Sequence, residues 1–529
     1  MDYQYLNVGS ARDLSGSDRV LYRLLEISIG LLSWLTLILM FFYSRFFPVE
    51  IAFFIIVFDI YWFFKSIYLS VHLRSHWKKM RHYMSLDWEK RLKNFRYDHL
   101  WQMVILPFYK EEEKIISSSM ESLLDAKWDK NKMIVVLAYE ERAGELAEKN
   151  AENVYQNYKD RFGFFIKVKH PKDIPGDLPG KGSNIAYAAR VAKEKILDSN
   201  NIKYEDVLVS SFDIDTRVYP QYFLCLTWHF LTSEKPYRSS FQPVPFYNNN
   251  IWDAPAFSRV IATSGTFWQM IEQERPEQLV TFSSHSMTFK ALEEVGYWQR
   301  NIVSEDSRIF WRSLLYFNGD YRVEPIAYPV SMDANLGRGF LETVKNVYKQ
   351  QRRWAWGTAE NLAYISFGFL KNKEIPSRIK WRHFLIQLES AWSAATSPLI
   401  IFFLGWLPVV LGGETFNRTL LSYNLPRITS YIMTVAMLGL VFSAGISVSL
   451  LPSPPPHKKK YHKIFIILQW LLMPIILPVF GSIPNLDAQT RLMLGKYMGF
   501  WVTPKHRKDE MILKEETGHF SKGILENKN

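Results

Sequence analysis

Apolar residues are concentrated in long runs near both ends of the chain. Residues 27–43 carry no charged side chain, and residues 51–68 carry only two, Asp59 and Lys65. A helix needs about 20 residues to cross a hydrocarbon layer of about 30 Å, so each run is near the length of a membrane span. Two later runs are uncharged and long enough as well, residues 390–413 and 430–451. The pattern predicts membrane helices on both sides of a central region.

A further apolar run, residues 464–480, is interrupted by Pro474 and Pro478. Counting it as a span would place the basic C-terminal tail across the membrane from residues 74–96. That segment carries eight Lys and Arg against two acids, which places it in the cytoplasm by the positive-inside rule. We therefore expect residues 464–480 to be re-entrant or interfacial, since broken helices are tolerated where protein covers the freed backbone.

The central region, residues 100–368, alternates short apolar runs with stretches of helical periodicity, as is typical of a parallel α/β domain. Helical stretches such as 115–124 and 185–196 separate the runs. Ligands of such sheets gather at the carboxyl ends of the strands, where the polar clusters of this chain fall. The expected strands are residues 103–106, 133–138 and 207–212.

Composition narrows the classes of function. The net charge of +12 lies largely beside the apolar runs, which suits anionic lipid headgroups. No basic helix is interleaved with base-stacking aromatic residues, so nucleic acid is not an expected partner. Cys225 is the only cysteine, which excludes an intrachain disulfide and a zinc site built from cysteine pairs. No small-residue cleavage site follows the first apolar run, so we expect a retained anchor.

Two carboxylates, Asp213 and Asp215, directly follow the apolar run 207–212. Carboxylates at the end of a strand can hold a divalent cation that keeps free positions for phosphate oxygens. A solvated turn also explains an Asp-x-Asp sequence. The motif alone favours the turn.

Ser304, Glu305 and Asp306 precede the helical run 309–315. Ser304 is suited to an N-cap, and the two acids then lie favourably in the first helical turn. Alternatively, one carboxylate is a general base that takes a proton from an acceptor hydroxyl. The local sequence leaves both interpretations open.

Gln350, Arg353 and Trp354 lie in a helical stretch that begins near Leu341. Their spacing places all three on one helix face, whereas Arg352 points elsewhere. Arginine suits diphosphate binding and tryptophan suits stacking on a sugar ring. A basic and aromatic helix resting on a membrane surface is the alternative.

Lys181 lies in a glycine-flanked segment, Gly180 to Asn184. The segment is not a P-loop, because that motif needs Gly where Pro175 stands and Ser or Thr where Gly182 stands. A lysine at the start of a helix can still meet phosphates. A flexible surface loop is the alternative.

Five segments occur in an order that resembles the processive type of glycosyltransferase family 2, which includes the cellulose, chitin and hyaluronan synthases. Residues 289–296 are similar to that family as well, and the resemblance covers residues 100–360 and the membrane-flanked arrangement. The five segments are 107–112, 181–184, 213–215, 305–306 and 350–354.

The resemblance implies a role for each matched residue. Asp213 and Asp215 would hold Mg²⁺ or Mn²⁺ beside the nucleotide diphosphate, and Asp306 would be the general base with Glu305 in support. The acceptor end and the diphosphate would be bound by Gln350, Arg353 and Trp354. Other nucleotide or substrate contacts would be Pro107, Tyr109, Glu111, Lys181 and Asn184.

The tail segment 500–505 resembles the Phe-x-Val-Thr-x-Lys gating loop of cellulose synthase, which closes over the bound nucleotide. The resemblance implies that Thr503 and Lys505 meet the diphosphate and that the tail is cytoplasmic. A basic juxtamembrane tail is the alternative.

The chain departs from the family after the second expected strand. The family commonly has Asp-Asp-x-Ser there to read uracil, whereas this chain has Ala138-Tyr139-Glu140-Glu141-Arg142. Glu140 or Glu141 can substitute, because a carboxylate still accepts a hydrogen bond from the N–H of a base. A UDP-sugar is therefore the default donor.

The resemblance implies a GT-A-like, Rossmann-like α/β domain, of the nucleotide-diphospho-sugar transferase kind, inserted between transmembrane helices. We expect a multi-pass protein of the plasma or inner membrane with a cytoplasmic catalytic domain. The expected parts are an N-terminal region with two spans and a basic linker (1–98), the transferase domain (99–375), a C-terminal membrane region (376–484) and a cytoplasmic tail (485–529).

The leading functional hypothesis is an inverting hexosyltransferase that extends a polysaccharide and is coupled to its export. An alternative transfers one sugar to a lipid acceptor and stops, and an alternative of another class is a nucleotide-sugar-binding or transport module with an inactive domain. The expected partners are a nucleotide-diphosphate sugar, a polysaccharide or lipid-linked acceptor and membrane lipid. Four clear spans are few for a polymer channel, so protomers of a homo-oligomer or an export partner would complete it.

Overall fold

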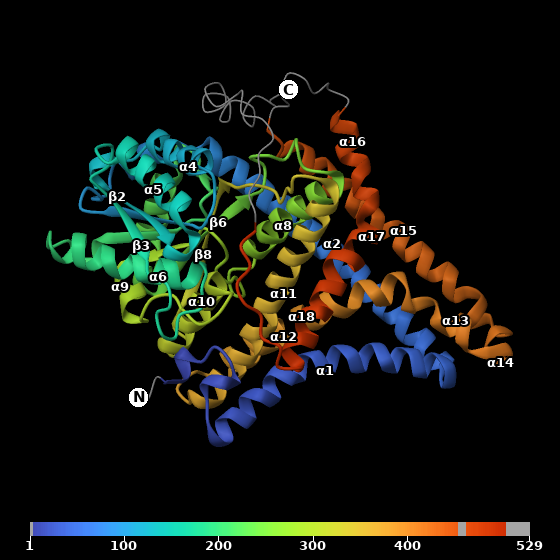
Figure 1. Ribbon diagram of the computed structural model, residues 1–529. Coiled ribbons are helices and arrows are strands. Elements are labelled where there is room, and N and C mark those ends of the chain that lie inside the picture. The colour runs from blue at the N-terminus through green and yellow to red at the C-terminus, as the bar shows by residue number, and fades with distance from the viewer. Residues whose placement is uncertain (1–3, 453–461, 504–529) are drawn as a thin grey trace.

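The computed structural model describes residues 4–452 and 462–503, and the first helices extend away from an α/β domain (Figure 1). Helix α1 (Gly16–Phe46) and helix α2 (Pro48–Ser85) contain the first two expected spans. Pro48 starts α2, because a proline at the first helical position loses no intrahelical hydrogen bond. Helix α2 continues through half of the basic segment and is followed by α3 (Trp88–Leu92).

The α/β domain is built on an eight-stranded mixed sheet, counted over the described residues, with the strand order β3-β2-β1-β4-β7-β6-β8-β5. Strands β1 to β4 are parallel, β7 is antiparallel to both β4 and β6, and β8 is parallel to β6. The strands are β1 (Trp101–Phe108), β2 (Met133–Glu140), β3 (Phe164–His170), β4 (Val207–Ser211), β5 (Arg217–Val218), β6 (Ser239–Phe246), β7 (Ser286–Thr288) and β8 (Arg322–Ser331).

The three strands expected from the sequence are confirmed as β1, β2 and β4. Alternate side chains of β1 enter two different cores: Met103 and Ile105 pack toward α6 and α10, whereas Val104 and Leu106 pack toward α4 and α7. Burial on both faces explains why these strands are nearly continuous apolar runs. The helices of this part are α4 (Glu113–Asp125), α5 (Glu145–Tyr158), α6 (Lys181–Ala192), α7 (Tyr222–Thr232), α8 (Ala256–Gln273), α9 (Phe289–Glu294) and α10 (Glu305–Tyr316).

Strand β1 lies between β2 and β4. The chain adds β2 and β3 on one side of β1 and then crosses back to add β4 on the other side. Such a switch point opens a crevice beyond the carboxyl ends of the strands. The segments that follow β1, β2 and β4 meet there, and they contain Tyr109, Glu140 and Asp213.

Helix α11 (Phe340–Lys371) joins the α/β domain to the helices that follow it (Figure 1). Its second half is buried against α10 and against residues 4–15, which we call the N-terminal segment. The later helices are α12 (Ser377–Phe402), α13 (Leu407–Leu411), α14 (Gly413–Asn417), α15 (Leu420–Ser449), α16 (His462–Leu468), α17 (Met473–Ile476) and α18 (Ile483–Met493).

Within residues 4–452 and 462–503, three helical stretches are long and apolar enough to cross a membrane, Gly16–Phe46, Pro48–Ser85 and Ile464–Met493. The expected span over residues 390–413 is bent: α12 and the stretch Leu404–Leu411 meet at 50°, as in a broken span or a re-entrant loop, so its crossing of the membrane stays a prediction. Pro408 cannot donate to the carbonyl of Leu404, and its ring would clash with that carbonyl in a straight helix. The run 430–451 lies mostly in α15, several side chains of which are outside the described residues, so its span stays a prediction.

The stretch Ile464–Met493 stays in contact with the α/β domain along its length. Trp470 stacks on Phe267 of α8 with ring centroids 5.5 Å apart, and Phe480 stacks on Phe257 at 5.3 Å. Further along, Asp487 accepts from Arg352 of α11 at 2.8 Å. A helix that crossed the membrane would leave these partners after its first turns, so the contacts favour an interfacial segment.

Arg308 of α10 makes buried contacts with α11 and with the N-terminal segment. It is fully buried, donates to Asn361 of α11 at 2.6 Å and to the Val8 carbonyl at 3.2 Å, and lies 3.7 Å from the Glu360 carboxylate. One guanidinium therefore joins α10, α11 and the N-terminal segment.

We expect Arg308→Met to destabilise the protein by about 3–5 kcal/mol, because it leaves the buried Glu360 carboxylate without its cation. Thermal unfolding followed by tryptophan fluorescence in detergent measures this change. The matched control is Arg322→Met, which breaks partly exposed pairs with Glu234 and Glu324 and should cost about 1 kcal/mol or less. Equal melting temperatures for the two variants would contradict the assigned role of Arg308.

Candidate active site

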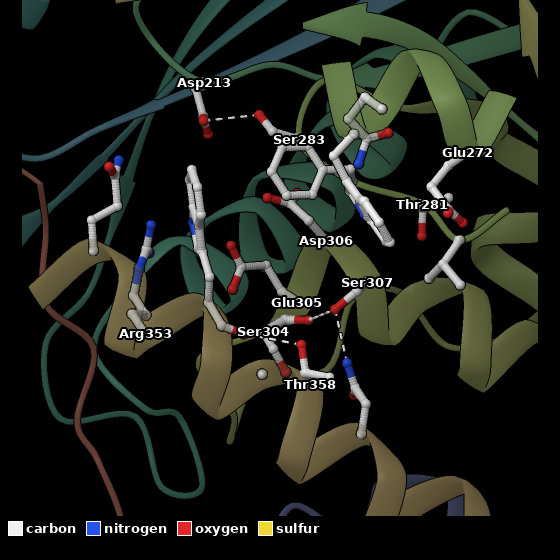
Figure 2. Close-up of a pocket in the computed structure, with 18 of the residues that line it drawn as sticks. Asp213, Glu272, Thr281, Ser283, Ser304, Glu305, Asp306, Ser307, Arg353 and Thr358 are labelled. Carbon is white, nitrogen blue, oxygen red and sulfur yellow. Dashed lines mark hydrogen bonds between the residues drawn. The ribbon is translucent and has the colours of Figure 1, made fainter. Parts of the chain in front are cut away.

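A cavity of about 930 Å³ lies at the carboxyl edge of β1, β2 and β4, between the α/β domain and α11. Figure 2 shows Asp213, Asp306 and Arg353 facing this space from three different elements. Lys505 lies outside the described residues. Every other site residue expected from the sequence lines the cavity: Pro107, Tyr109, Glu111, Glu140, Lys181, Asn184, Asp213, Asp215, Glu305, Asp306, Gln350, Arg353, Trp354 and Thr503.

Lys181 is the link between the two acidic motifs. Its ammonium, at the start of α6, donates to Asp213 Oδ1 at 2.7 Å and to the two Asp306 oxygens at 2.9 and 2.8 Å. Burial alone would lower the pKa of Lys181, but the charges of Asp213 and Asp306 raise it above its ordinary value. Lys181 is therefore a permanent cation between the two carboxylates.

Asp213 and Asp215 meet different surroundings although they are two residues apart. Asp213 faces the cavity and accepts from the Ser283 hydroxyl at 2.9 Å, whereas Asp215 is fully buried and accepts from the Asp333 backbone N–H at 2.8 Å. Oxygen ligands of this kind suit Mg²⁺ or Mn²⁺. Over the described residues no group of three potential metal-ligating side chains occurs, so a cation here would depend on phosphate oxygens of a substrate. The carboxylates fit that use.

Glu305 and Asp306 form the first turn of α10, and both point toward the cavity in Figure 2. The structure places Ser304 at the N-cap position, but its hydroxyl donates to Glu360 at 2.7 Å and makes no cap hydrogen bond. The N-cap interpretation is therefore wrong for the Ser304 side chain. Burial and the neighbouring Asp306 charge raise the pKa of Glu305 to about 8.

His285 lies behind Asp306 as a buried, neutral ring. Its Nδ1 is 3.0 Å from the Phe282 carbonyl and 3.9 Å from Asp306 Oδ1, and its Nε2 accepts from Trp298 at 3.3 Å. Burial lowers the pKa of His285, so it does not compete with Lys181 as a cation. The ring fixes the wall against which Asp306 rests.

The face of α11 expected from the sequence is the one that lines the cavity. Gln350, Arg353 and Trp354 all lie on it, and the Trp354 ring packs beside Phe282 with centroids 5.8 Å apart. Arg352 points the other way, to Asp487 of α18. One face of α11 therefore lines the cavity, and another face contacts α18.

The segment after α18 returns to the cavity. The Arg353 guanidinium lies over the Phe500 ring at 4.8 Å, and buried Thr503 lines the cavity. Gly180 has a φ of +152°, and a Cβ atom there would lie 2.5 Å from Phe500. Only glycine therefore allows Phe500 to pack this close to Lys181.

The residues after β1 and β2 that line the cavity are held by local pairs. The Glu140 carboxylate accepts hydrogen bonds from Nε and Nη2 of Arg142. The Arg142 guanidinium in turn lies 4.4 Å from the Tyr109 ring centroid. Glu111 accepts from the Tyr109 N–H at 2.7 Å. The Glu141 side chain does not line the cavity and accepts a hydrogen bond from the Lys172 backbone N–H. Of the two acids, only Glu140 lines the cavity, so a base contact by Glu140 stays a prediction that involves Arg142.

The cavity also has a second half, which sequence reasoning missed. It continues past Glu272 and Thr281, opposite Arg353 in Figure 2, to a mouth between α2 and α12. There Lys65 of α2 pairs with Glu389 of α12. The signal was present in the sequence, since a lysine within an apolar run indicates a functional position.

The mouth is apolar and open. Tyr61, Phe64 and Tyr68 of α2 are 48%, 63% and 45% exposed, and Leu385 of α12 is 54% exposed. Among the described residues, those lining the cavity include none of α1 or α15 and none beyond Ser390 on α12. On α2 the lining runs from Leu69 to Tyr61, so the cavity extends into the expected span 51–68 and does not stop at the domain-side end of that helix, Ser85.

Comparisons with known proteins give one family match. Residues 208–478 match the family described as Glycosyl transferase family group 2. A probable glycosyltransferase of Sulfolobus acidocaldarius is 24% identical over 360 residues, which are 66% of this chain and 66% of that protein. A poly-beta-1,6-N-acetyl-D-glucosamine synthase of Staphylococcus epidermidis is 24% identical over 144 residues, 27% of this chain and 32% of that protein. The matches span less than two thirds of either relative.

Solved structures show weaker likeness. The mannosyltransferase PcManGT from Pyrobaculum calidifontis, in complex with GDP-Man and Mn²⁺, is 12% identical with a TM-score of 0.39, covering 73% of this chain and 99% of that one. S. aureus TarS 1–349 in complex with UDP-GlcNAc is 11% identical with a TM-score of 0.34, covering 75% and 91%.

The raised pKa of Glu305 predicts a pH-dependent stability. A folded-state pKa raised from 4.5 to about 8 means that the folded protein holds this proton more tightly than the unfolded chain. The stabilising contribution is complete below pH 4.5 and is lost as the pH rises to about 8. We therefore expect the melting temperature of the wild type to fall relative to Glu305→Gln across this window.

Thermal unfolding of the ligand-free protein at a series of pH values checks the expectation. Glu194→Gln, which alters an exposed carboxylate, is the matched control and should follow the wild-type curve. Parallel curves for the wild type and Glu305→Gln would show that Glu305 is ionised throughout.

Proposed function

The chain belongs to glycosyl transferase family group 2, which confirms the expected enzyme class, and on that premise we propose an inverting membrane glycosyltransferase. Its donor is a nucleotide-diphosphate sugar, with a UDP-sugar as the default, and its acceptor is a growing polysaccharide. The observation that carries the proposal is the Lys181 bridge, which sets the candidate base Asp306 beside the candidate diphosphate ligand Asp213. The relative that makes a poly-N-acetylglucosamine supports the polysaccharide acceptor.

The proposed reaction begins with a proton transfer. The Asp306 carboxylate takes the proton of an acceptor hydroxyl, whose oxygen attacks the anomeric carbon in line and inverts it. The nucleoside diphosphate leaves with the electrons of the broken bond. Because donor and acceptor share one cavity, their orientation removes much of the entropic barrier.

Cationic groups receive the leaving diphosphate. Lys181 and Arg353 line the cavity next to Asp213, and the Phe500–Thr503 segment covers them. A divalent cation held by Asp213 and Asp215 would supply further stabilisation of negative charge. Positive groups placed where charge develops are usually the largest contribution to such a rate.

We place the catalytic domain in the cytoplasm of a multi-pass membrane protein. The N-terminal segment contacts the domain, since the Tyr364 hydroxyl donates to the Leu6 carbonyl at 3.1 Å. The end of α15 returns to the domain-side part of α2, where Trp77 donates to Ser449 at 2.9 Å. We therefore propose that α1 and α2 cross the membrane as one pair and α12 and α15 as another, and the basic segment 74–96 supports a cytoplasmic domain.

A second candidate is transfer to a lipid-linked acceptor. The specific observation is the exposed aromatic mouth between α2 and α12, which opens sideways where a bilayer would lie. A lipid anchor can remain in the bilayer there while its head reaches Asp306. A polymer leaving through the protein would need a path along the helices, and among the described residues the lining follows α2 only from Leu69 to Tyr61 and includes none of α1 or α15.

We expect Asp306→Asn to lower sugar transfer by about 10²–10⁴-fold with little change in donor affinity, because the amide cannot take a proton. Purified protein in lipid is incubated with a panel of nucleotide sugars and Mg²⁺ or Mn²⁺, and released nucleotide and product size are measured.

The outcomes separate the candidate functions. A product of high molecular weight supports the polysaccharide synthase, and a single added sugar on a lipid supports the second candidate. Ser307→Ala is the matched control on the same helix and should keep most of the activity. Nucleotide binding without release for any donor would favour the inactive binding module.

The mouth generates a separate expectation for the acceptor. Glu389→Gln and Lys65→Met should each raise the acceptor KM by roughly 5- to 30-fold, equivalent to about 1–2 kcal/mol, with the donor KM unchanged. Steady-state kinetics at saturating donor measure this. Lys235→Met, which breaks an exposed pair with Asp320 away from the cavity, is the matched control. A parallel rise in the donor KM would assign the pair to general structure.

A further inference from the structure

A second, smaller pocket of about 220 Å³ lies outside the main cavity. It is formed by the N-terminal segment, the loop before α6, the segment after α9, and helices α6 and α10. Its volume is below the roughly 300–1,000 Å³ of pockets for organic ligands, so it suits a small polar group. The lining residues are Asn7, Gly176, Arg190, Gly296, Trp298, Gln299, Arg300, Asn301 and Arg312.

Three arginines define the charge of this pocket, which we call the arginine pocket. Arg312 is 7% exposed and donates to two backbone carbonyls, those of Val295 at 2.5 Å and Leu6 at 3.3 Å. Arg190 lies over the Tyr297 ring at 4.8 Å. Arg300 pairs with Asp177 at 2.7 Å.

Protein carboxylates balance only part of this positive charge, through the pair of Arg300 with Asp177. Among the described residues that line the arginine pocket there is no Asp or Glu. The carboxylate whose charge acts on Arg190 is Asp177, which is already engaged by Arg300. Besides the Tyr364 hydroxyl, the groups that act on Arg312 are the like charges of Arg308, Arg190 and Arg300, of which Arg308 lies 3.7 Å from Glu360. A buried cation surrounded by cations is costly unless an anion joins it.

The arginine fork indicates the class of anion. Guanidinium groups bind phosphate through paired N–H donors more specifically than ammonium groups do. Glycine at positions 176 and 296 leaves the walls open, and a Cβ at Gly296 would lie 3.0 Å from a nitrogen of Arg312. The Arg312 guanidinium therefore reaches the pocket only past a residue without a side chain.

The arginine pocket shares its wall with the catalytic helices. The Arg300 carbonyl accepts from the Leu178 N–H at 2.9 Å, just before Lys181 at the start of α6. On the other side, the Gln299 side chain accepts from Arg308 at 3.1 Å, two residues after Asp306 on α10. Residues 299 and 300 thus contact the supports of both Lys181 and Asp306.

We propose that the arginine pocket binds a phosphate group and thereby holds α6 and α10 in the arrangement that pairs Lys181 with Asp306. Two sources share this chemistry, a free phosphate or phosphomonoester and the headgroup of an anionic phospholipid. The lipid source is included because the N-terminal segment that contributes Asn7 leads into α1, whose uncharged run begins at Ile27. The proposal does not depend on the identity of donor or acceptor.

The experiment measures the melting temperature of the full chain with and without inorganic phosphate, and in nanodiscs of phosphatidylcholine with or without phosphatidic acid. We expect phosphate or phosphatidic acid to stabilise the wild type, and Arg190→Gln together with Arg300→Gln to weaken that effect at least 10-fold. Without the anion, Arg190→Gln alone should leave the melting temperature unchanged or raised, because it removes like-charge repulsion.

Two controls make the result decisive. Arg353→Gln changes the main cavity and should keep the response, whereas Arg161→Gln changes an exposed arginine and should resemble the wild type. A response to dissolved phosphate identifies the soluble source, and a response to phosphatidic acid alone identifies the lipid source. No response to either, or a response lost in Arg353→Gln and kept in the Arg190 and Arg300 variant, overturns the proposal.

Discussion

The ammonium group of Lys181 is the contact on which the site depends. It lies between a carboxylate that follows β4 and a carboxylate that begins α10, so it sets the separation of two elements far apart in the sequence. Asp213 and Asp306 would repel each other without it. The same helix start that carries Lys181 also contacts Phe500 through Gly180, so the tail is packed against the bridge. Asp213, Asp306 and the tail segment around Phe500 thus all lie close to Lys181.

The membrane helices and the catalytic domain form one packed structure. Arg308 joins the N-terminal segment to α10 and α11, and Arg23 of α1 donates to the carbonyls of Leu492 and Met493 at the end of α18. These contacts connect the first and last described elements of the chain. A disturbance of the N-terminal segment therefore reaches the helix that presents Asp306.

Much of the site followed from the sequence because local rules act there. A run of apolar residues ending in Asp213 predicts a strand with its acid at the carboxyl edge, and the spacing of Gln350, Arg353 and Trp354 predicts one face of a helix. The family resemblance supplied the roles, which contacts alone do not. Contacts between distant segments did not follow: the pairing of Lys65 with Glu389 and the use of the Ser304 hydroxyl by Glu360 depend on how helices pack. The bend after α12 was missed because hydropathy counts apolar residues and gives no weight to the carbonyl that Pro408 displaces.

Arg352 and Arg353 are neighbours in sequence, yet one is fastened to α18 and the other faces the catalytic cavity. If α18 rests at the surface of the bilayer, one turn of α11 sets the height of the reacting centre above the lipid. The protein then selects acceptors by the distance between the bilayer surface and the reacting hydroxyl. An acceptor anchored in the membrane reacts only if its hydroxyl stands at that height, and a shorter or longer headgroup is refused without any contact that recognises its chemistry.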